Sequence, residues 1–173
     1  MKEQLYTIPV NDAFEKDCEC PLCFMYNNLE EDAVSFTLGP SYMEDDIRLE
    51  TDKAGFCMHH IKQLYKHQNR LGVALILHTH MKYTTDKLKS ATKSSSPSKK
   101  GLFSKKEQSG TGAYISSLEK SCYICSRIDN VFKRYIATVL HCYVHDEDFA
   151  GKFTKCKGFC TKHYGMLYEA AGS

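Results

Sequence analysis

Two short cysteine motifs recur in both halves of this chain, and their repetition limits its possible folds more than any other feature. The first half has CPLC at 20–23 and GFCMHH at 55–60; the second has CYIC at 122–125 and GFCTKH at 158–163. Residues 24–56 and 126–159 lie between the two motifs' cysteines, so the separations are nearly equal. This order and spacing predict a duplicated unit whose copies fold alike.

The motifs supply the ligand types and spacing of a four-coordinate metal site. Two thiolates of a CxxC motif can bind one ion, and Cys-x-x-His on the first turn of a helix places both side chains on one face. Gly55 and Gly158 permit a sharp turn before that helix. We expect each half to close one site. The predicted ligands are Cys20, Cys23, Cys57 and His60 in the first half, and Cys122, Cys125, Cys160 and His163 in the second.

Zinc is the expected metal, with two ions per chain, because three thiolates and one imidazole suit its tetrahedral coordination. Iron or an iron–sulfur cluster is the less favoured alternative, since sulfur-rich sites suit both. Four protein ligands leave no position for an activated water, which indicates structural zinc. Two other thiols stay open as substitutes: Cys18 for Cys20, and Cys156 as an alternative ligand.

Composition favours a globular protein of the cytoplasm. The 173 residues are 42% hydrophobic with a formal net charge of +2, which does not indicate a uniformly basic nucleic-acid surface. The first 16 residues lack the apolar run of a signal peptide, and LGVALIL at 71–77 is too short to cross a bilayer. Nine cysteines in a reducing compartment are metal ligands or redox groups rather than structural disulfides.

Apolar spacing predicts an all-α fold of two pseudo-repeated three-helix metal-binding modules packed together. In the first half we expect a helix from Leu22 to Gly39-Pro40, a second from a capping box of Ser41 and Glu44 to near Gly55, and a long third helix from about Cys57 through Met81. In the second half a stripe marks one helix, Asp146 or Asp148 caps a short one, and the last begins near Cys160. The stripe consists of Ile128, Phe132, Tyr135, Val139 and Cys142.

The predicted domains are 1–86, the first helical repeat, and 113–173, the second. Between them, 87–112 is rich in Lys, Ser and Gly and is expected to be a flexible linker. On the long helix, several basic side chains could form a groove for a small anionic ligand or a peptide; the alternative is that the histidines are satisfied by contacts between helices. These residues are His67, Arg70, His78 and His80.

The chain resembles an uncharacterised bacterial family, classed as a domain of unknown function, with paired CPxC and GFCxxH motifs. The resemblance lies in YTIPVNDAF at 6–14, CPLC, TLGPSYMEDDIR at 37–48, NRLGVALILHTHMK at 69–82 and both GFCxxH motifs. It covers nearly all of the chain outside the linker. It implies a cytoplasmic bacterial protein and carries no known activity, partner or catalytic residue.

The favoured function is therefore a zinc-binding structural or adaptor protein with an unknown protein or small ligand as its partner and no membrane contact. An enzyme is the less favoured class, and no catalytic residue is predicted. A thiol–disulfide or redox-sensing protein that uses Cys20 and Cys23 is the first alternative. Nucleic-acid binding is the second and weaker one. It would use four linker lysines: Lys99, Lys100, Lys105 and Lys106.

Overall fold

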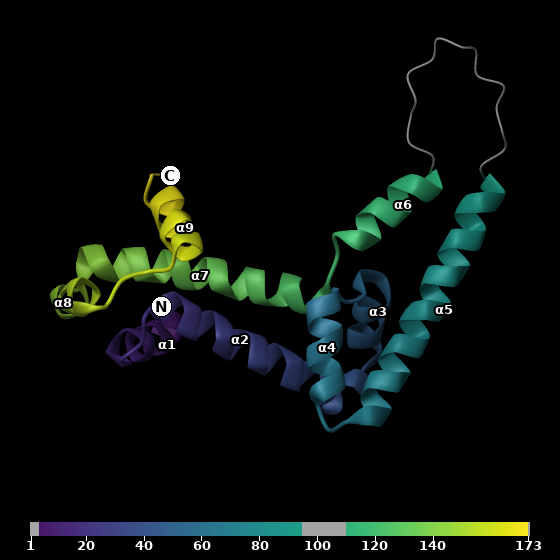
Figure 1. Ribbon diagram of the computed structural model, residues 1–173, viewed down its shortest axis with the longest axis horizontal. Coiled ribbons are helices and arrows are strands. Elements are labelled where there is room, and N and C mark those ends of the chain that lie inside the picture. The colour runs from purple at the N-terminus through teal and green to yellow at the C-terminus, as the bar shows by residue number, and fades with distance from the viewer. Residues whose placement is uncertain (1–3, 95–109, 173) are drawn as a thin grey trace, which may run out of the picture. The chain divides into compact units, whose positions relative to one another are not determined.

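The computed structural model describes residues 4–94 and 110–172, and within these ranges the chain is helical with no strand (Figure 1). The all-α prediction is confirmed. In chain order the elements are α1 (Gln4–Glu15), α2 (Pro21–Leu38), the 3-10 turn η1 (Pro40–Met43), α3 (Asp45–Ala54), α4 (Met58–Lys66), α5 (Arg70–Ser94), α6 (Gly110–Glu119), α7 (Tyr123–His145), α8 (Glu147–Lys155) and α9 (Thr161–Ala171).

The chain divides into two compact units, and each contains parts of both sequence halves. Unit 1 comprises Met1–Ala33 and Arg127–Ser173, and unit 2 comprises Val34–Ser126. The unit boundaries fall within α2 and α7. These units differ in composition from the segments 1–86 and 113–173, which remain a sequence-based prediction.

The core of unit 1 joins the start of the chain to its end. Phe14 of α1 is buried, and its ring lies 4.9 Å from that of Phe149 and 5.6 Å from that of Phe153, both on α8. At the edge of this contact, Lys152 Nζ donates to Glu15 Oε1 at 2.6 Å. The first helix, α1, and the helix α8 near the C-terminus therefore lie side by side (Figure 1).

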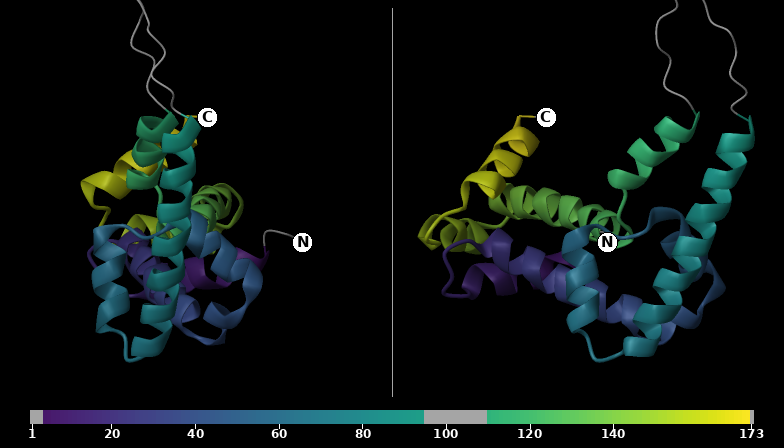
Figure 2. Two further views of the ribbon diagram at one scale, coloured as in Figure 1. Left: turned by 90° about the vertical axis from the view of Figure 1, so that its right-hand side faces the viewer. Right: turned by 45° about the vertical axis from the view of Figure 1, so that its right-hand side comes forward.

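Unit 2 is organised around α5. This helix packs along α3, and α4 and α6 also contact it (Figure 2). Val73 and Ile76 of α5 and Leu64 of α4 are buried, as is Thr51 of α3. In unit 2, α3 therefore packs on α5, in the same way that α8 packs on α1 in unit 1.

Several predicted helix ends are confirmed and have clear local causes. The helix α2 begins at Pro21, whose missing N–H is no loss in the first turn, and it ends just before Gly39-Pro40. Asp146 caps α8, where its side chain accepts a hydrogen bond from Phe149 N at 3.1 Å. On α7, the predicted stripe is buried at Ile128, Phe132, Val139 and Cys142.

The prediction of one long helix from Cys57 through Met81 is wrong. The chain breaks after Lys66, and Asn69 caps the start of α5, where its side-chain oxygen accepts from Gly72 N at 2.9 Å. The same amide donates to Leu38 O at 2.7 Å, which anchors the break to the end of α2. His67 and His78 consequently lie on either side of a break and do not share one helix face.

Two further local predictions need correction. Ser41 does not cap a helix, because it lies within η1 and its hydroxyl donates to Phe36 O; the cap of α3 is Glu44, which makes no side-chain capping bond. No helix is predicted over residues 4–15, where the structure has α1 with Pro9 inside it. A proline removes one backbone donor, and α1 includes it nonetheless.

The predicted linker is helical at both of its ends. Residues 87–94 belong to α5 and residues 110–112 to α6. The remainder of this prediction, 95–109, lies outside the described residues.

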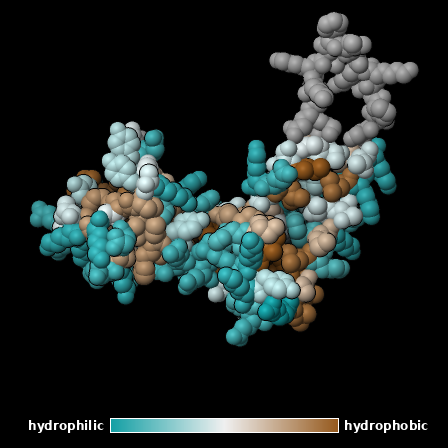
Figure 3. Space-filling view, in the orientation of Figure 1, coloured by the Kyte–Doolittle hydropathy of each residue, from teal (hydrophilic) through white to brown (hydrophobic). Residues whose placement is uncertain are grey.

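Hydrophilic residues cover much of the visible surface, with apolar patches between them (Figure 3). Within residues 4–94 and 110–172, no helix combines the length and apolarity that crossing a membrane requires.

Candidate metal centres

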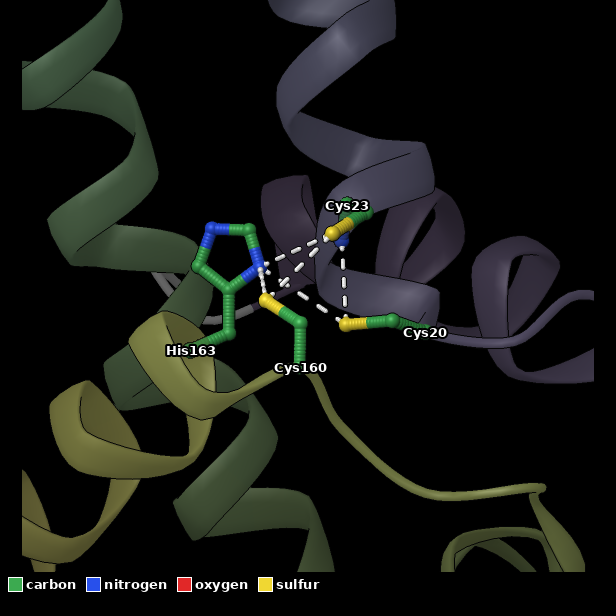
Figure 4. A group of neighbouring side chains, drawn as sticks. All are labelled: Cys20, Cys23, Cys160 and His163. Atoms are coloured by element: carbon green, nitrogen blue, oxygen red, sulfur yellow. Dashed lines mark hydrogen bonds between the residues drawn. The ribbon is translucent and has the colours of Figure 1, made fainter.

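Unit 1 contains the first of two cysteine–histidine clusters, here named the 20/160 cluster: Cys20, Cys23, Cys160 and His163 (Figure 4). Its cysteines surround the imidazole nitrogen His163 Nδ1. That atom lies 3.6 Å from Cys20 Sγ, 3.3 Å from Cys23 Sγ and 3.4 Å from Cys160 Sγ. Cys23 Sγ and Cys160 Sγ are 3.6 Å apart.

Unit 2 contains the second, named the 57/122 cluster: Cys57, His60, Cys122 and Cys125. Here too Nδ1 of the histidine faces the sulfurs. His60 Nδ1 lies 3.2 Å from Cys57 Sγ, 3.2 Å from Cys122 Sγ and 3.4 Å from Cys125 Sγ. Cys57 Sγ and Cys125 Sγ are 3.9 Å apart.

The structure brings all eight predicted ligands into clusters but reverses their pairing. The prediction that each half closes its own site is wrong: each CxxC motif meets the Cys-x-x-His motif of the other half. The reason lies in the helices that follow the CxxC motifs. At 1.5 Å per residue, α2 extends about 27 Å and α7 about 35 Å. Each helix carries the chain away from its CxxC motif before the next motif is reached.

The measured donor-atom distances are compatible with a single tetrahedral ion. With metal–sulfur bonds of about 2.3 Å and metal–nitrogen bonds of about 2.0 Å, tetrahedral geometry separates two sulfurs by roughly 3.8 Å and sulfur from nitrogen by roughly 3.5 Å. The two sulfur–sulfur distances of 3.6 and 3.9 Å lie close to the first value. The sulfur–nitrogen distances, 3.2–3.6 Å, lie within 0.3 Å of the second. Both clusters could therefore hold one metal ion each.

The helix starts direct these side chains inward. Cys57 and Cys160 precede α4 and α9 in extended conformation, and their carbonyls accept the first helical bonds, from Ile61 N at 2.9 Å and Tyr164 N at 2.8 Å. The histidine then lies on the first turn of the same helix. Sulfur at a helix N-terminus is favoured as thiolate by the helix dipole. The glycines just upstream have positive φ, 61° at Gly55 and 123° at Gly158, which other residues rarely adopt.

In each cluster one thiol ionises more easily and another resists ionisation. Burial opposes ionisation of Cys57, but the backbone N–H of His60 and the thiols of Cys122 and Cys125 donate to its sulfur, and together they lower its pKa. Burial and the neighbouring Cys122 and Cys57 raise the pKa of Cys125 to about 12. Three thiolates in so small a volume repel one another, so the cluster retains protons unless a cation neutralises it.

The 20/160 cluster follows the same electrostatic pattern. The backbone N–H of His163 lowers the pKa of Cys160, whereas burial, with hydrogen bonds to Cys160 and Cys20, raises the pKa of Cys23 to about 12. A divalent cation bound to the sulfurs would remove this conflict, because it favours every thiolate at once.

Both histidines are buried, and His163 is held in the neutral, ligand-competent form. His60 is 1% exposed and His163 3% exposed. Burial, with a smaller contribution from Lys162, lowers the pKa of His163. Its ring lies 5.2 Å from that of Phe132, and its buried Nε2 has no hydrogen-bond partner among the described residues. Only Nδ1 of His163 is therefore directed at polar atoms, and all of these are cysteine sulfurs.

The comparison with protein families covers this whole arrangement. A model of a family of unknown function, DUF6062, matches residues 1–173. The chain belongs to the DUF6062 family. Neither the curated proteins nor the solved structures yield a match. The predicted resemblance to an uncharacterised family is confirmed, and the cysteine–histidine clusters are the feature of this DUF6062 chain from which its function can be argued.

The remaining candidate residues lie outside both clusters. Cys18 and Cys156 are half-buried, and the structure places Cys20 rather than Cys18 in the group of three thiols and one imidazole. His67 follows the end of α4. Arg70 begins α5, and its guanidinium lies 5.0 Å from the centre of the Tyr65 ring.

The other two members of the predicted groove are further along α5. His78 and His80 lie eight and ten residues beyond Arg70, which is about 12–15 Å along the helix axis. His80 is occupied, since its Nδ1 donates to Asp52 O at 2.9 Å. A ligand groove formed by these residues remains a prediction.

Sequence reasoning missed the contacts that hold the two motifs of unit 2 together. Tyr123 N donates to Gly55 O at 2.9 Å, and the Ser121 hydroxyl donates to Ala54 O at 2.6 Å. No local signal marks these residues, because their partners are far away in the sequence.

Proposed function

We propose that the chain is a zinc-binding structural or adaptor protein that holds two Zn²⁺ ions, one in the 20/160 cluster and one in the 57/122 cluster. Three thiolates and one imidazole are an established ligand set of structural zinc. Iron is the weaker candidate: sulfur-rich tetrahedral sites suit both metals, but three thiolates with one imidazole are a frequent ligand set of structural zinc.

The observation that carries this proposal is the reciprocal pairing of the motifs. Cys20 and His163 are 143 residues apart, and His60 and Cys122 are 62 apart. An ion in either cluster would therefore join segments 4–94 and 110–172. Structural zinc contributes on the order of 10 kcal/mol in small modules, so two ions would secure a fold whose units each combine distant segments.

A structural role follows from the coordination. Four protein donors complete a tetrahedron and leave no position at which the ion could activate a water or polarise a substrate. The metal would shape the protein, and the protein's task would be to bind a protein or a small ligand. A reducing cytoplasm, where cysteines stay available as ligands, suits this chemistry.

Elemental mass spectrometry tests the proposal, with protein purified in parallel with and without oxygen. We expect about two zinc per chain in both preparations. His60→Ala and His163→Ala should each retain about one ion, and His145→Ala, an exposed histidine of α7, should retain two. Iron in the anaerobic sample only would favour cluster chemistry. Metal-free protein with an intact helical fold would overturn the proposal.

The two alternatives have separate tests. A thiol–disulfide protein would show a reversible titration of Cys20 and Cys23 with no metal release. Nucleic-acid binding would weaken steeply with salt and with neutralisation of Lys99, Lys100, Lys105 and Lys106. These four lysines lie outside the described residues.

A further inference from the structure

The two clusters have the same types of ligand but differ in the hydrogen bonds that join the backbone segments around them. In the 57/122 cluster, the loop before α4 and the loop before α7 are joined by the bonds Tyr123 N to Gly55 O and Ser121 Oγ to Ala54 O. These two bonds connect the polypeptide segments that carry the two pairs of ligands. The 57/122 cluster is therefore closed by protein contacts as well as by any ion.

The 20/160 cluster has different residues at the corresponding positions. Pro21 takes the place of Tyr123 and, lacking an N–H, cannot donate to the carbonyl of Gly158. Glu19 takes the place of Ser121. The contacts found here are ion pairs from Lys157 Nζ to Asp17 at 2.6 Å and to Glu19 at 3.7 Å. The three side chains are 49%, 87% and 91% exposed, so water and salt weaken these pairs.

A second difference concerns the glycine before each Cys-x-x-His motif. A Cβ on Gly55 would lie 2.5 Å from the His80 ring, because α5 packs directly against this loop. A Cβ on Gly158 would meet no heavy atom of the described residues within 4 Å. The loop of the 57/122 cluster is thus packed against α5 at Gly55. The loop of the 20/160 cluster has open space at Gly158 and is packed at the next residue, where the Phe159 ring lies 6.2 Å from that of Phe14 and 5.3 Å from that of Phe153.

A third difference is access to the ligands themselves. A hollow of about 530 Å³ in unit 1 is lined by Cys20, Cys23 and Cys160, together with the non-ligand thiol Cys18. Cys160 is exposed, whereas its counterpart Cys57 is half-buried. The residue that corresponds to Cys18 in the second half is Lys120, so the extra thiol belongs to the 20/160 cluster only.

We propose that the 20/160 cluster is an exchangeable metal site, whereas the 57/122 cluster retains its ion as a structural element. Through the hollow, the 20/160 cluster would accept a soft thiolate donor, either a low-molecular-weight thiol or a cysteine pair of a partner protein. Cys18 is the internal entering group. This inference rests on the proposed function, since both clusters must first bind zinc.

The exchange step involves no oxidation or reduction. Cys18, which lines the same hollow, would hold the ion in place of one of Cys20, Cys23 and Cys160. The proton that Cys18 loses to solvent would be matched by the proton that the displaced thiolate takes up, and an external thiolate could then replace Cys18 in the same way.

Zinc transfer from the full-length, zinc-loaded protein to the chromogenic chelator 4-(2-pyridylazo)resorcinol tests this proposal. We expect zinc to be released in two phases of one ion each. The first phase should be faster than the second by about tenfold or more, because the 57/122 cluster has two additional hydrogen bonds that slow its release of the ion. A pulse of N-ethylmaleimide after the first phase, followed by peptide mass spectrometry, should label Cys20, Cys23 and Cys160 and leave Cys57, Cys122 and Cys125 protected.

Variants address the role of Cys18. Cys18→Ser should slow the first phase about threefold or more without changing its amplitude, since a competing internal ligand is lost. Cys156→Ser is the matched control, because it removes a half-buried non-ligand thiol that does not line the hollow, and it should leave both phases unchanged. An unchanged rate in Cys18→Ser would remove Cys18 from the proposal.

The remaining outcomes separate the two proposals. Fewer than two zinc per chain at the start would contradict the proposed function itself. Two zinc at the start, followed by a single release rate or by earlier labelling of Cys57, Cys122 and Cys125, would overturn the exchange site alone. The labelling experiment uses the unmodified protein and so does not depend on whether any variant folds.

Discussion

Cleavage of the chain between α5 and α6 would test the reciprocal pairing directly. A protease site placed within 95–109 and cut after folding yields two fragments, which carry residues 4–94 and 110–172. Each cluster takes two ligands from each fragment: Cys20, Cys23, Cys57 and His60 from the first, and Cys122, Cys125, Cys160 and His163 from the second. We therefore expect the fragments to stay together while zinc is bound.

The expected affinity of the two fragments for each other follows from the number of protein ligands that each ion keeps. Separating the fragments leaves each ion with two of its four protein ligands. If a complete site is worth on the order of 10 kcal/mol, even one intact site holds the fragments with a dissociation constant of roughly 10⁻⁷ M or below. At about 10 μM in size-exclusion chromatography, the cleaved protein should elute as the intact chain does, and excess EDTA should split it into two peaks.

A metal site closed within each half of the chain would give a different result. Had each half closed its own site, the fragments would separate without chelator and each would carry one zinc. Co-elution that persists after complete removal of zinc would show that apolar contacts alone join the fragments, which would refute the reasoning about the metal. Elemental analysis of the collected peaks distinguishes these cases.

Two further predictions concern the fold around the 57/122 cluster. Gly55→Ala should lower the free energy of unfolding by about 1–3 kcal/mol in urea titration, because φ at Gly55 is 61° and the new Cβ meets the His80 ring. The control Gly151→Ala, in α8 with open space around it, should raise the free energy of unfolding by about 0.5–1 kcal/mol. Equal effects of the two substitutions would contradict this argument. Asn69→Ala should lower it by about 1–2 kcal/mol, since Gly72 N and Leu38 O both lose their partner. Asn69→Asp preserves the acceptor for Gly72 N and should lie between Ala and the original residue.

Much of the candidate site is written in local sequence. The CxxC and Cys-x-x-His motifs identify the eight side chains of the two clusters, because a site that could hold a metal needs specific donor atoms at short spacing, and Gly55 and Gly158 mark the turns before the Cys-x-x-His motifs. Helix ends with strong local signals, such as Gly39-Pro40 and Asp146, are likewise predictable. In each of these cases the physical cause acts within a few residues.

The local signals were insufficient where a distant partner decides the outcome. The break at Asn69 is secured by the carbonyl of Leu38, and the helix α1 includes Pro9 because Phe14 and its neighbours pack on α8. Neither partner can be recognised from the residues beside the break or the proline.

The pairing of the motifs shows the same division most clearly. The sequence alone determined which eight residues form the two clusters and that the fold is helical, because both depend on short-range spacing. Only the tertiary structure decided that Cys20 and Cys23 meet Cys160 and His163. Equal motif spacing in the two halves is compatible with either pairing, and the lengths of α2 and α7, together with the contacts of distant segments, select one.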